Sequence, residues 1–154
     1  MKVKNIFKEH GLYIQKESYS CGPCSILNVL RLKGDFSRNE YELIKLCDAK
    51  PNRGTSRANM VKVANDVGLK VIEETEEAST KDLERNLGKG AYVIIAYWHA
   101  YDEVGHYGLI TDYDDEAFYF ADCDFGFIRI WKENLGKFWH NTDKTAHRWF
   151  MAVK

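Results

Sequence analysis

Long apolar runs are absent from this chain of 154 residues. The longest run, from Ala91 to Trp98, is far too short to span a bilayer, so we expect no membrane insertion. The first eight residues, which end at Lys8, also lack the apolar core of a signal peptide. These two absences predict a cytoplasmic protein.

Charge of one sign is not in excess either. The 22 basic and 23 acidic residues leave a net charge of -1 at pH 7. Proteins that bind nucleic acid carry a basic surface, so we expect no nucleic-acid partner. Hydrophobic residues make up 45% of the chain, which argues against disorder. Residues 1–154 are therefore predicted to form a single domain, which buries roughly two-thirds of its unfolded surface.

Cysteine is sparse, with four positions at Cys21, Cys24, Cys47 and Cys123. Thiols stay reduced in the cytoplasm, so these four do not predict a disulfide framework. Each is expected to be a free thiol whose role depends on its surroundings.

The pattern of apolar residues changes near Lys70, from helical before it to mostly strand-like after it. The predicted helices cover residues 24–33, a segment opened by a capping box at 37–40, a segment from Thr55 or Ser56 to Gly68, and the shorter 79–88 and 132–139. The predicted strands cover residues 70–74, 92–98, 106–113, 118–122, 127–131 and 148–153. Helices first and then an antiparallel sheet indicate an α+β fold.

The first of these helices follows the tetrapeptide Cys21-Gly22-Pro23-Cys24 and ends at Gly34. Only a narrow polar strip interrupts its apolar surface, at Ser25, Asn28 and Arg31. A helix this apolar is expected to be central rather than superficial.

Cys21 lies where a thiol has nucleophilic chemistry. Unpaired N–H groups and the positive end of the helix dipole favour the thiolate and lower the thiol pKa. The N–H of Cys21 would point at the group that the sulfur attacks, and the amide of Gln15, six residues earlier, can reach the same place. Together they would supply two donors for the oxyanion of a tetrahedral intermediate.

His106 is the candidate general base, in Gly105-His106-Tyr107-Gly108 at the head of a predicted strand. The pKa of histidine suits a group that accepts a thiol proton and later protonates an amine leaving group. The flanking glycines would let a substrate or another backbone come close. His99 is a competing candidate without such a setting. The remaining histidines are predicted to be surface or terminal residues: His10, His140 and His147.

Asp122 ends a predicted strand next to a turn. Its carboxylate could hold the far imidazole nitrogen of His106 and so fix the tautomer and orientation of the ring. Asp124 or Asp112 could take this role instead.

Three other interpretations of Cys21 remain open. Free cysteine is often a small buried hydrophobic residue. The tetrapeptide 21–24 is also a dithiol redox motif, although such a motif follows a hydrophobic strand and residues 15–20 are polar. A zinc site could use Cys21, Cys24, His106 and Cys123, although a second close pair of ligands is missing.

Gln15, Cys21, His106 and Asp122 together resemble the papain-like cysteine peptidases. They are most similar to the family that cuts double-glycine leader peptides from bacteriocin precursors as the N-terminal domain of certain ABC exporters. That family has a glutamine six residues before Cys-Gly, a His-Tyr that starts a strand and an aspartate four residues before a glycine. The matching positions here are Gln15 to Cys21-Gly22, His106-Tyr107 and Asp122 to Gly126.

The resemblance implies a papain-like fold whose helical N-terminal part carries the nucleophile on a central helix packed against an antiparallel sheet. It implies that Cys21 is the nucleophile, His106 the general base and acid, and Asp122 the residue that orients the imidazole. Gln15 would complete the oxyanion hole. The substrate would be a peptide or protein with small residues near the scissile bond, and no metal or organic cofactor is implied.

Four positions depart from the family pattern. Pro23 and Cys24 are unusual in the first turn of the helix. Ser20 stands where the family usually has an aspartate, and Cys123 stands where a proline usually follows the catalytic aspartate. The phosphate-binding Gly-x-x-x-x-Gly-Lys loop of a transporter is also missing. We therefore expect a stand-alone domain, for which a transporter would be a separate partner. Another thiol acyl transferase or amidase, and an inactive domain that keeps the peptide cleft, remain as alternatives.

Overall fold

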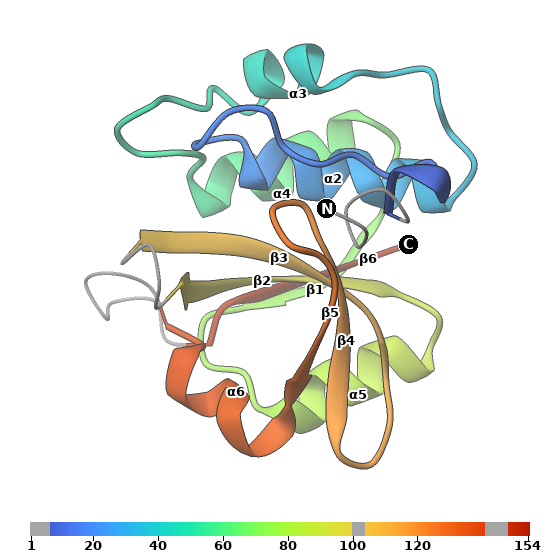
Figure 1. The fold of residues 1–154 in the computed structure, drawn as a ribbon, viewed down its shortest axis with the longest axis vertical. Coiled ribbons are helices and arrows are strands. Elements are labelled where there is room, and N and C mark those ends of the chain that lie inside the picture. The colour runs from blue at the N-terminus through green and yellow to red at the C-terminus, as the bar shows by residue number, and fades with distance from the viewer. Residues whose placement is uncertain (1–6, 100–103, 141–147) are drawn as a thin grey trace.

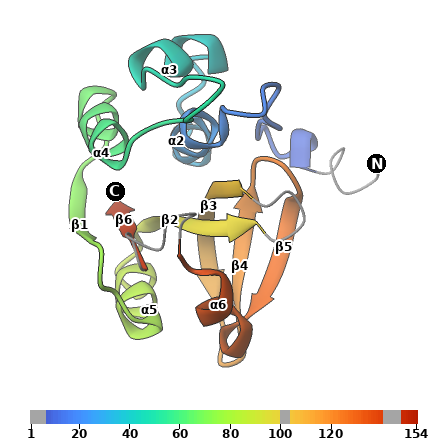
Figure 2. The ribbon, with the colours of Figure 1, turned by 90° about the vertical axis from the view of Figure 1, so that its left-hand side faces the viewer.

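The computed structural model describes residues 7–99, 104–140 and 148–154, which are arranged in three layers (Figure 1). Helices α2, α3 and α4 lie on one side of a β-sheet, and α5 and α6 lie on the other (Figure 2). The elements in chain order are α2 (Cys21–Leu32), α3 (Glu40–Leu46), α4 (Arg57–Asp66), β1 (Val71–Thr75), α5 (Thr80–Gly88), β2 (Tyr92–His99), β3 (Val104–Tyr113), β4 (Ala117–Asp122), β5 (Gly126–Trp131), α6 (Lys132–Phe138) and β6 (Phe150–Val153). The predicted α+β fold is confirmed.

The sheet has six strands in the order β1-β6-β2-β3-β4-β5, and every neighbouring pair is antiparallel. The last strand of the chain does not lie at an edge, because β6 pairs with both β1 and β2. Strand β3 lies between β2 and β4, and its N-terminal part approaches helix α2. The residues at the head of β3, from Val104 to Leu109, are held by the ladder to β2, whereas the pairs with β4 begin at Ile110.

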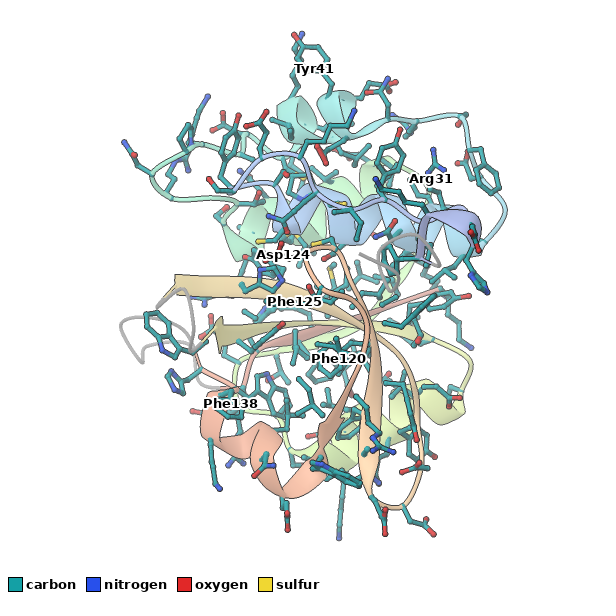
Figure 3. All side chains as sticks on the ribbon, viewed as in Figure 1. Arg31, Tyr41, Phe120, Asp124, Phe125 and Phe138 are labelled. Atoms are coloured by element: carbon teal, nitrogen blue, oxygen red, sulfur yellow. The ribbon has the colours of Figure 1, made fainter. Side chains whose placement is uncertain are left out.

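Apolar side chains fill the space on both faces of the sheet (Figure 3). Along β2, Ile94 belongs to the core shared with α2 and α4, whereas Val93 and Ile95 belong to the core shared with α5 and α6. Successive residues of a strand point to opposite faces, so a strand covered on both faces is apolar throughout. This explains the continuous apolar run that the sequence shows at 92–98.

The polar strip of α2 anchors the segment that precedes the helix. Asn28 accepts the N–H of Tyr13 at 2.7 Å and donates to its carbonyl at 3.0 Å. Arg31 donates to the carbonyl of Gly11 at 2.8 Å. These bonds hold residues 11–15 along the helix, and they explain why polar side chains occur on an otherwise buried helix.

Helix α3 begins later than its capping box predicts. Asn39 is the N-cap and accepts the N–H of Glu42 at 2.9 Å, whereas Ser37 bonds to Asp35. The carboxylate of Glu40 does not reach back to the cap, because it accepts the N–H of Lys16 at 3.1 and 3.2 Å. A tertiary contact has therefore displaced the local motif.

Among the described residues, no helix combines the length and the apolar character that crossing a membrane requires.

Candidate active site

Helix α2 places Cys21 at its first residue, with 8% of the side chain exposed. The preceding residue, Ser20, does not cap the helix, because its hydroxyl donates to the carbonyl of Glu17. Within the described part of the chain, the N–H of Cys21 has no acceptor. The helix N-terminus thus keeps a free donor beside the sulfur.

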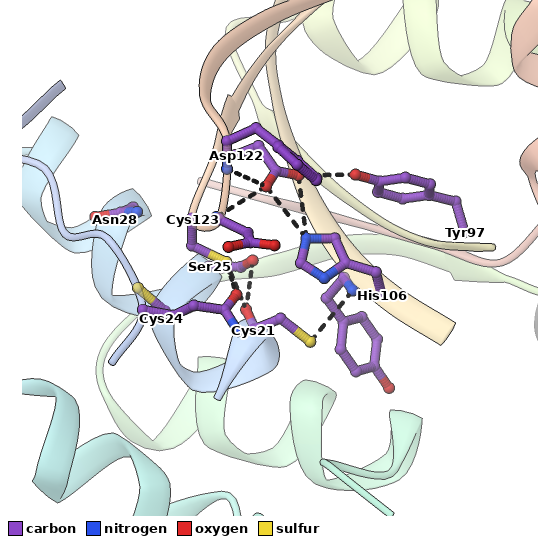
Figure 4. A network of polar contacts seen from close by, with 12 residues as sticks. Cys21, Cys24, Ser25, Asn28, Tyr97, His106, Asp122 and Cys123 are labelled. Carbon is purple, nitrogen blue, oxygen red and sulfur yellow. Dashed lines mark hydrogen bonds and ion pairs between the residues drawn. The ribbon is translucent and has the colours of Figure 1, made fainter. Parts of the chain in front are cut away.

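Strand β3 brings a second donor to the sulfur. The N–H of Tyr107 donates to Cys21 Sγ at 3.5 Å (Figure 4). The Tyr107 hydroxyl donates to the carbonyl of Thr55 at 2.7 Å, just before α4. This second bond joins the sheet to the helical layer and fixes the strand opposite Cys21.

His106 precedes Tyr107 on β3 and is buried between Cys21 and Asp122 (Figure 4). Its Nε2 lies 3.1 and 3.2 Å from the two carboxylate oxygens of Asp122. The other ring nitrogen, Nδ1, is on the side of the Cys21 sulfur (Figure 4). A thiol, an imidazole and a carboxylate from three different elements therefore lie in one row.

Asp122 is fully buried, and four groups bond to its carboxylate. Besides His106, the Tyr97 hydroxyl donates to Oδ2 at 2.8 Å. The N–H groups of Asp124 and Phe125 donate to Oδ1 at 2.9 and 3.1 Å. Gly126, at a φ of 86°, completes this tight turn from β4 to β5. A buried carboxylate needs such partners to remain ionised.

The other two candidate aspartates have different positions. Asp124 contributes its backbone N–H to the turn, and Asp112 lies exposed on β3. The carboxylate beside the His106 ring is that of Asp122.

Electrostatics in this row favour a thiolate beside an imidazolium. Burial raises the pKa of Cys21, but the charge of His106, a hydrogen bond from its ring and the Tyr107 N–H together bring it below its ordinary value of 9.0. Burial lowers the pKa of His106, but the charge of Cys21 and the bond to Asp122 raise it well above 6.5. The two groups stabilise each other in their charged forms.

The pKa of the Asp122 carboxyl group is also set by burial and by its neighbours. Burial raises the pKa of Asp122, but the hydrogen bond and charge of His106, the Asp124 N–H and the Tyr97 hydroxyl hold it below 3.8. Asp122 is therefore an anion that stabilises the imidazolium.

Gln15 also lies at this site, tied to the residue after Asp122. Its N–H donates to the carbonyl of Cys123 at 2.7 Å, and its Oε1 accepts the Cys123 thiol at 3.0 Å. Its Nε2 donates to the carbonyl of Glu17 at 2.9 Å. One of the two amide protons of Gln15 is therefore engaged, and the second is left for another acceptor.

The two cysteines of the tetrapeptide point in different directions. Cys24 Sγ donates to the carbonyl of Tyr13 at 3.5 Å, on the opposite side from the Cys21 sulfur (Figure 4). All four cysteines are free. This geometry does not favour a dithiol redox pair.

The described residues do gather one set of donor atoms that could hold a metal ion, from His106, Asp122 and Cys123, within 4.8 Å of one another. It differs from the predicted zinc set, which included Cys24. In the metal-free protein, burial and the neighbouring Cys24 raise the pKa of Cys123 well above its ordinary value. The absence of a metal requirement stays a prediction.

Sequence reasoning missed the bond of Tyr97 to Asp122, and it considered Cys123 as a zinc ligand but not as a partner of Gln15. A usable signal existed for Tyr97, because a tyrosine in a buried strand needs a partner for its hydroxyl. Among the other histidines, His10 is exposed and His140 stacks on Trp98. The side chain of His99 and the whole of His147 lie outside the described residues.

Two hollows flank the segment that leads to Gln15. The larger, about 430 Å³, is lined by Lys8, Gly11, Leu12, Tyr13, Ile14, Gln15, Lys16 and Arg31. The smaller, about 270 Å³, lies between this segment and α3, and its lining includes Tyr13, Lys16 and Tyr41.

The fold is similar to several solved peptidase domains. The peptidase domain of Streptococcus ComA, a bi-functional ABC transporter involved in quorum sensing, superposes with a TM-score of 0.71 at 17% identity, over 93% of this chain and 95% of that one. A double glycine motif protease from an AMS/PCAT transporter, solved in complex with the leader peptide, gives 0.66 at 16% identity, over 92% and 89%. A putative C39-like peptidase from Bacillus anthracis gives 0.71 at 13% identity, over 93% and 92%.

A comparison with curated proteins gave no match. The sequence model of one family matches residues 10–143, which is most of the chain and includes Gln15, Cys21, His106 and Asp122. The predicted kinship with the bacteriocin-processing peptidases is thereby confirmed: the chain belongs to the Peptidase C39 family.

Proposed function

We propose that this protein hydrolyses peptide bonds with Cys21 as the nucleophile, His106 as the general base and acid, and Asp122 as the residue that orients the imidazole. The observation that carries the proposal is the buried row of these three groups, in which the thiol pKa is lowered and the imidazole pKa is raised. Cysteine peptidases need this combination, since only the thiolate attacks a carbonyl efficiently.

The reaction would proceed in two stages. In the first, Cys21 Sγ attacks the scissile carbonyl carbon, and the resulting oxyanion receives hydrogen bonds from the Cys21 N–H and the Gln15 amide. Collapse of this intermediate breaks the C–N bond while His106 protonates the departing amine, which leaves an acyl-enzyme. In the second, His106 takes a proton from water as the water oxygen attacks the thioester carbonyl. The C–S bond then breaks, which releases the acid and restores the Cys21 thiolate beside the protonated imidazole. No step requires a metal or an organic cofactor.

We further propose a peptide with small residues before the scissile bond as the substrate. Support comes from the family and from the similar double glycine motif protease that was solved with a leader peptide. The hollow that Gln15 helps to line offers room for an extended segment. A transporter would act as a separate partner, and residues 1–154 would work as one domain in a reducing compartment where the four thiols stay free.

The same fold also suits an amidase, another thiol acyl transferase or an inactive peptide-binding domain. The test is hydrolysis of an acyl-Gly-Gly-aminomethylcoumarin and of a peptide that contains Gly-Gly, by the wild type, Cys21→Ala and Cys24→Ala. The proposal expects no hydrolysis by Cys21→Ala and activity within about threefold of wild type in Cys24→Ala, whereas a redox or zinc function needs both cysteines.

A second measurement examines the nucleophile without a substrate. The rate of iodoacetamide alkylation of Cys21 is measured against pH in the wild type and in His106→Ala. The proposal expects a reactive thiolate at a pH below the ordinary thiol range in the wild type, and an ordinary profile in His106→Ala. An ordinary profile in both proteins would refute the catalytic role, even if the domain binds peptides.

A further inference from the structure

Two hydrogen bonds join Gln15 to Cys123, one of the positions at which this chain departs from the family pattern. The first is between backbones, from the Gln15 N–H to the Cys123 carbonyl at 2.7 Å. The second is between side chains, from the Cys123 thiol to Gln15 Oε1 at 3.0 Å. Cys123 is 1% exposed, so its thiol is shielded from solvent.

The remaining end of the Gln15 amide is held as well. Nε2 donates one proton to the carbonyl of Glu17 at 2.9 Å. With Oε1 bonded to Cys123 and one Nε2 proton bonded to Glu17, both ends of the amide have a partner that orients its plane. The second Nε2 proton therefore keeps a defined direction.

Cys123 is also joined to the residue that carries the nucleophile. Its sulfur contacts the carbonyl oxygen of Cys21 at 3.6 Å. One buried thiol thus contacts both the side chain of Gln15 and the backbone of Cys21. Burial and the neighbouring Cys24 raise the pKa of Cys123 well above its ordinary value, which keeps it a protonated donor.

We propose that Cys123 is a positioning residue, whose thiol orients the Gln15 amide so that its free N–H points at the oxyanion. This inference rests on the proposed function. It assigns to an unmodified, protonated thiol a role separate from that of the nucleophilic Cys21. A donor fixed before the substrate arrives is worth more than one that must be ordered during the reaction.

Cys123 also interacts with the ring of His106, so its loss could act along a second route. A double-mutant cycle separates the two routes, because residues that act through one another give non-additive effects. The four proteins are the wild type, Cys123→Ala, Gln15→Ala and the double variant, assayed with acyl-Gly-Gly-aminomethylcoumarin. Cys47→Ala is the matched control, since Cys47 is equally buried but lies at the end of α3.

We expect Cys123→Ala to lower kcat about tenfold with KM unchanged, because a misdirected oxyanion donor costs less than the 10²–10³ of a deleted one. In the Gln15→Ala background the same change should lower kcat less than twofold. Cys123→Ser, which keeps a donor, should recover kcat to within about threefold of wild type. The pH profile of Cys21 alkylation should not move in Cys123→Ala.

Three outcomes would overturn the inference while leaving the peptidase intact. They are an unchanged kcat in Cys123→Ala, a full additive loss in the double variant, or a shifted alkylation profile, which would place the effect at His106. A wild type that hydrolyses no probe would instead refute the proposed function. Thermal unfolding of Cys123→Ala and Cys47→Ala, compared side by side, shows whether lost folding explains any loss of rate.

Discussion

The backbone N–H of Tyr107 donates a hydrogen bond to the sulfur of Cys21 across 3.5 Å. The two residues belong to different layers, Tyr107 to the sheet and Cys21 to the helix that covers it. Because His106 precedes Tyr107, one short piece of β3 supplies both the imidazole and a fixed donor to the thiolate. The surroundings of the Cys21 sulfur therefore come from the sheet as much as from its own helix.

A plot of kcat/KM against pH should be bell-shaped. The pKa of Cys21 lies below 9.0 and that of His106 above 6.5, so activity should rise as Cys21 ionises and fall as His106 loses its proton. Asp122→Asn removes a bond that raises the pKa of His106, so the alkaline limb should move to lower pH. Profiles of both proteins test this, and an alkaline limb that stays in place would contradict it.

Tyr97→Phe should weaken both activity and stability. It removes a hydrogen bond to the buried carboxylate of Asp122, a type of bond worth about 1.5–3 kcal/mol. A free energy of this size corresponds to a loss of roughly tenfold or more in kcat/KM, if the carboxylate position matters equally for the transition state. The control is Tyr119→Phe, whose hydroxyl bonds to the exposed Asp114 and should matter little.

Tyr97→Phe should also change how the stability of the protein depends on pH. The pKa of Asp122 is depressed in the folded protein, so its ionisation stabilises the fold above the unfolded pKa, and this stability is lost as the pH falls through the folded pKa. Without the Tyr97 hydroxyl the folded pKa rises, and acid unfolding should begin at a higher pH. Urea unfolding at a series of acidic pH values measures this, and coincident curves would rule out the Tyr97 contribution.

The four thiols should differ sharply in reactivity. Cys21 should be alkylated first in the native protein. Cys47 should resist, because it is fully buried and burial raises its pKa to about 12. Cys24 and Cys123 are equally inaccessible. Mass spectrometry of samples quenched over time, with a denatured control in which all four react, would contradict this if Cys47 reacted alongside Cys21.

Asn28→Ala should destabilise the protein by about 2–3 kcal/mol, because it leaves both the N–H and the carbonyl of Tyr13 without their partner. Activity should fall as well, since the freed segment carries Gln15. Asn65→Ala is a suitable control, because this exposed helical amide bonds only to the carbonyl of Val61 among the described residues. Equal unfolding midpoints for the two variants would argue against the anchoring role.

Gly108→Ala should damage the site by overpacking. A Cβ there would lie 2.6 Å from Tyr97 Cε1 and 3.2 Å from the ring of Phe120. Overpacked cores cost about 1–3 kcal/mol, and the displaced Tyr97 ring would lose Asp122. Gly88→Ala, whose Cβ meets its nearest neighbour at 3.7 Å, should not destabilise the fold. Matching stability and activity in the two variants would contradict this account.

Much of the fold followed from local patterns. Gly34 and Gly68 adopt positive φ after α2 and α4, as residues that end helices do, and the strand segments agree with the apolar runs to within a few residues. The start of α3 did not follow, because Glu40 is engaged by the backbone of Lys16. A local capping motif does not predict the helix start when a residue distant in sequence binds the side chain that the motif requires.

The sequence predicted which types of residue form the candidate site, but not all of the contacts between them. Residue types and spacing nominated Cys21, His106 and Asp122, but His99 and Asp124 remained as competing candidates. The contacts of Tyr97 and Cys123 depend on strand register: Tyr97 pairs with His106, and Cys123 meets Gln15 across 108 residues of sequence. No local pattern encodes such pairings, so these residues became visible only in three dimensions.

Cys21 lies in the helical layer, whereas His106 and Asp122 lie in the sheet, so the site forms late in synthesis. A ribosome releases helix α2 long before β3 exists, so the growing chain carries only an ordinary thiol at Cys21. The thiol of Cys21 should become reactive only when the sheet packs against the helix and places His106 beside it. An electrophilic dye added during synthesis should thus label Cys21 in completed, folded chains and not in nascent ones. Labelling of this sulfur would therefore report that folding is complete.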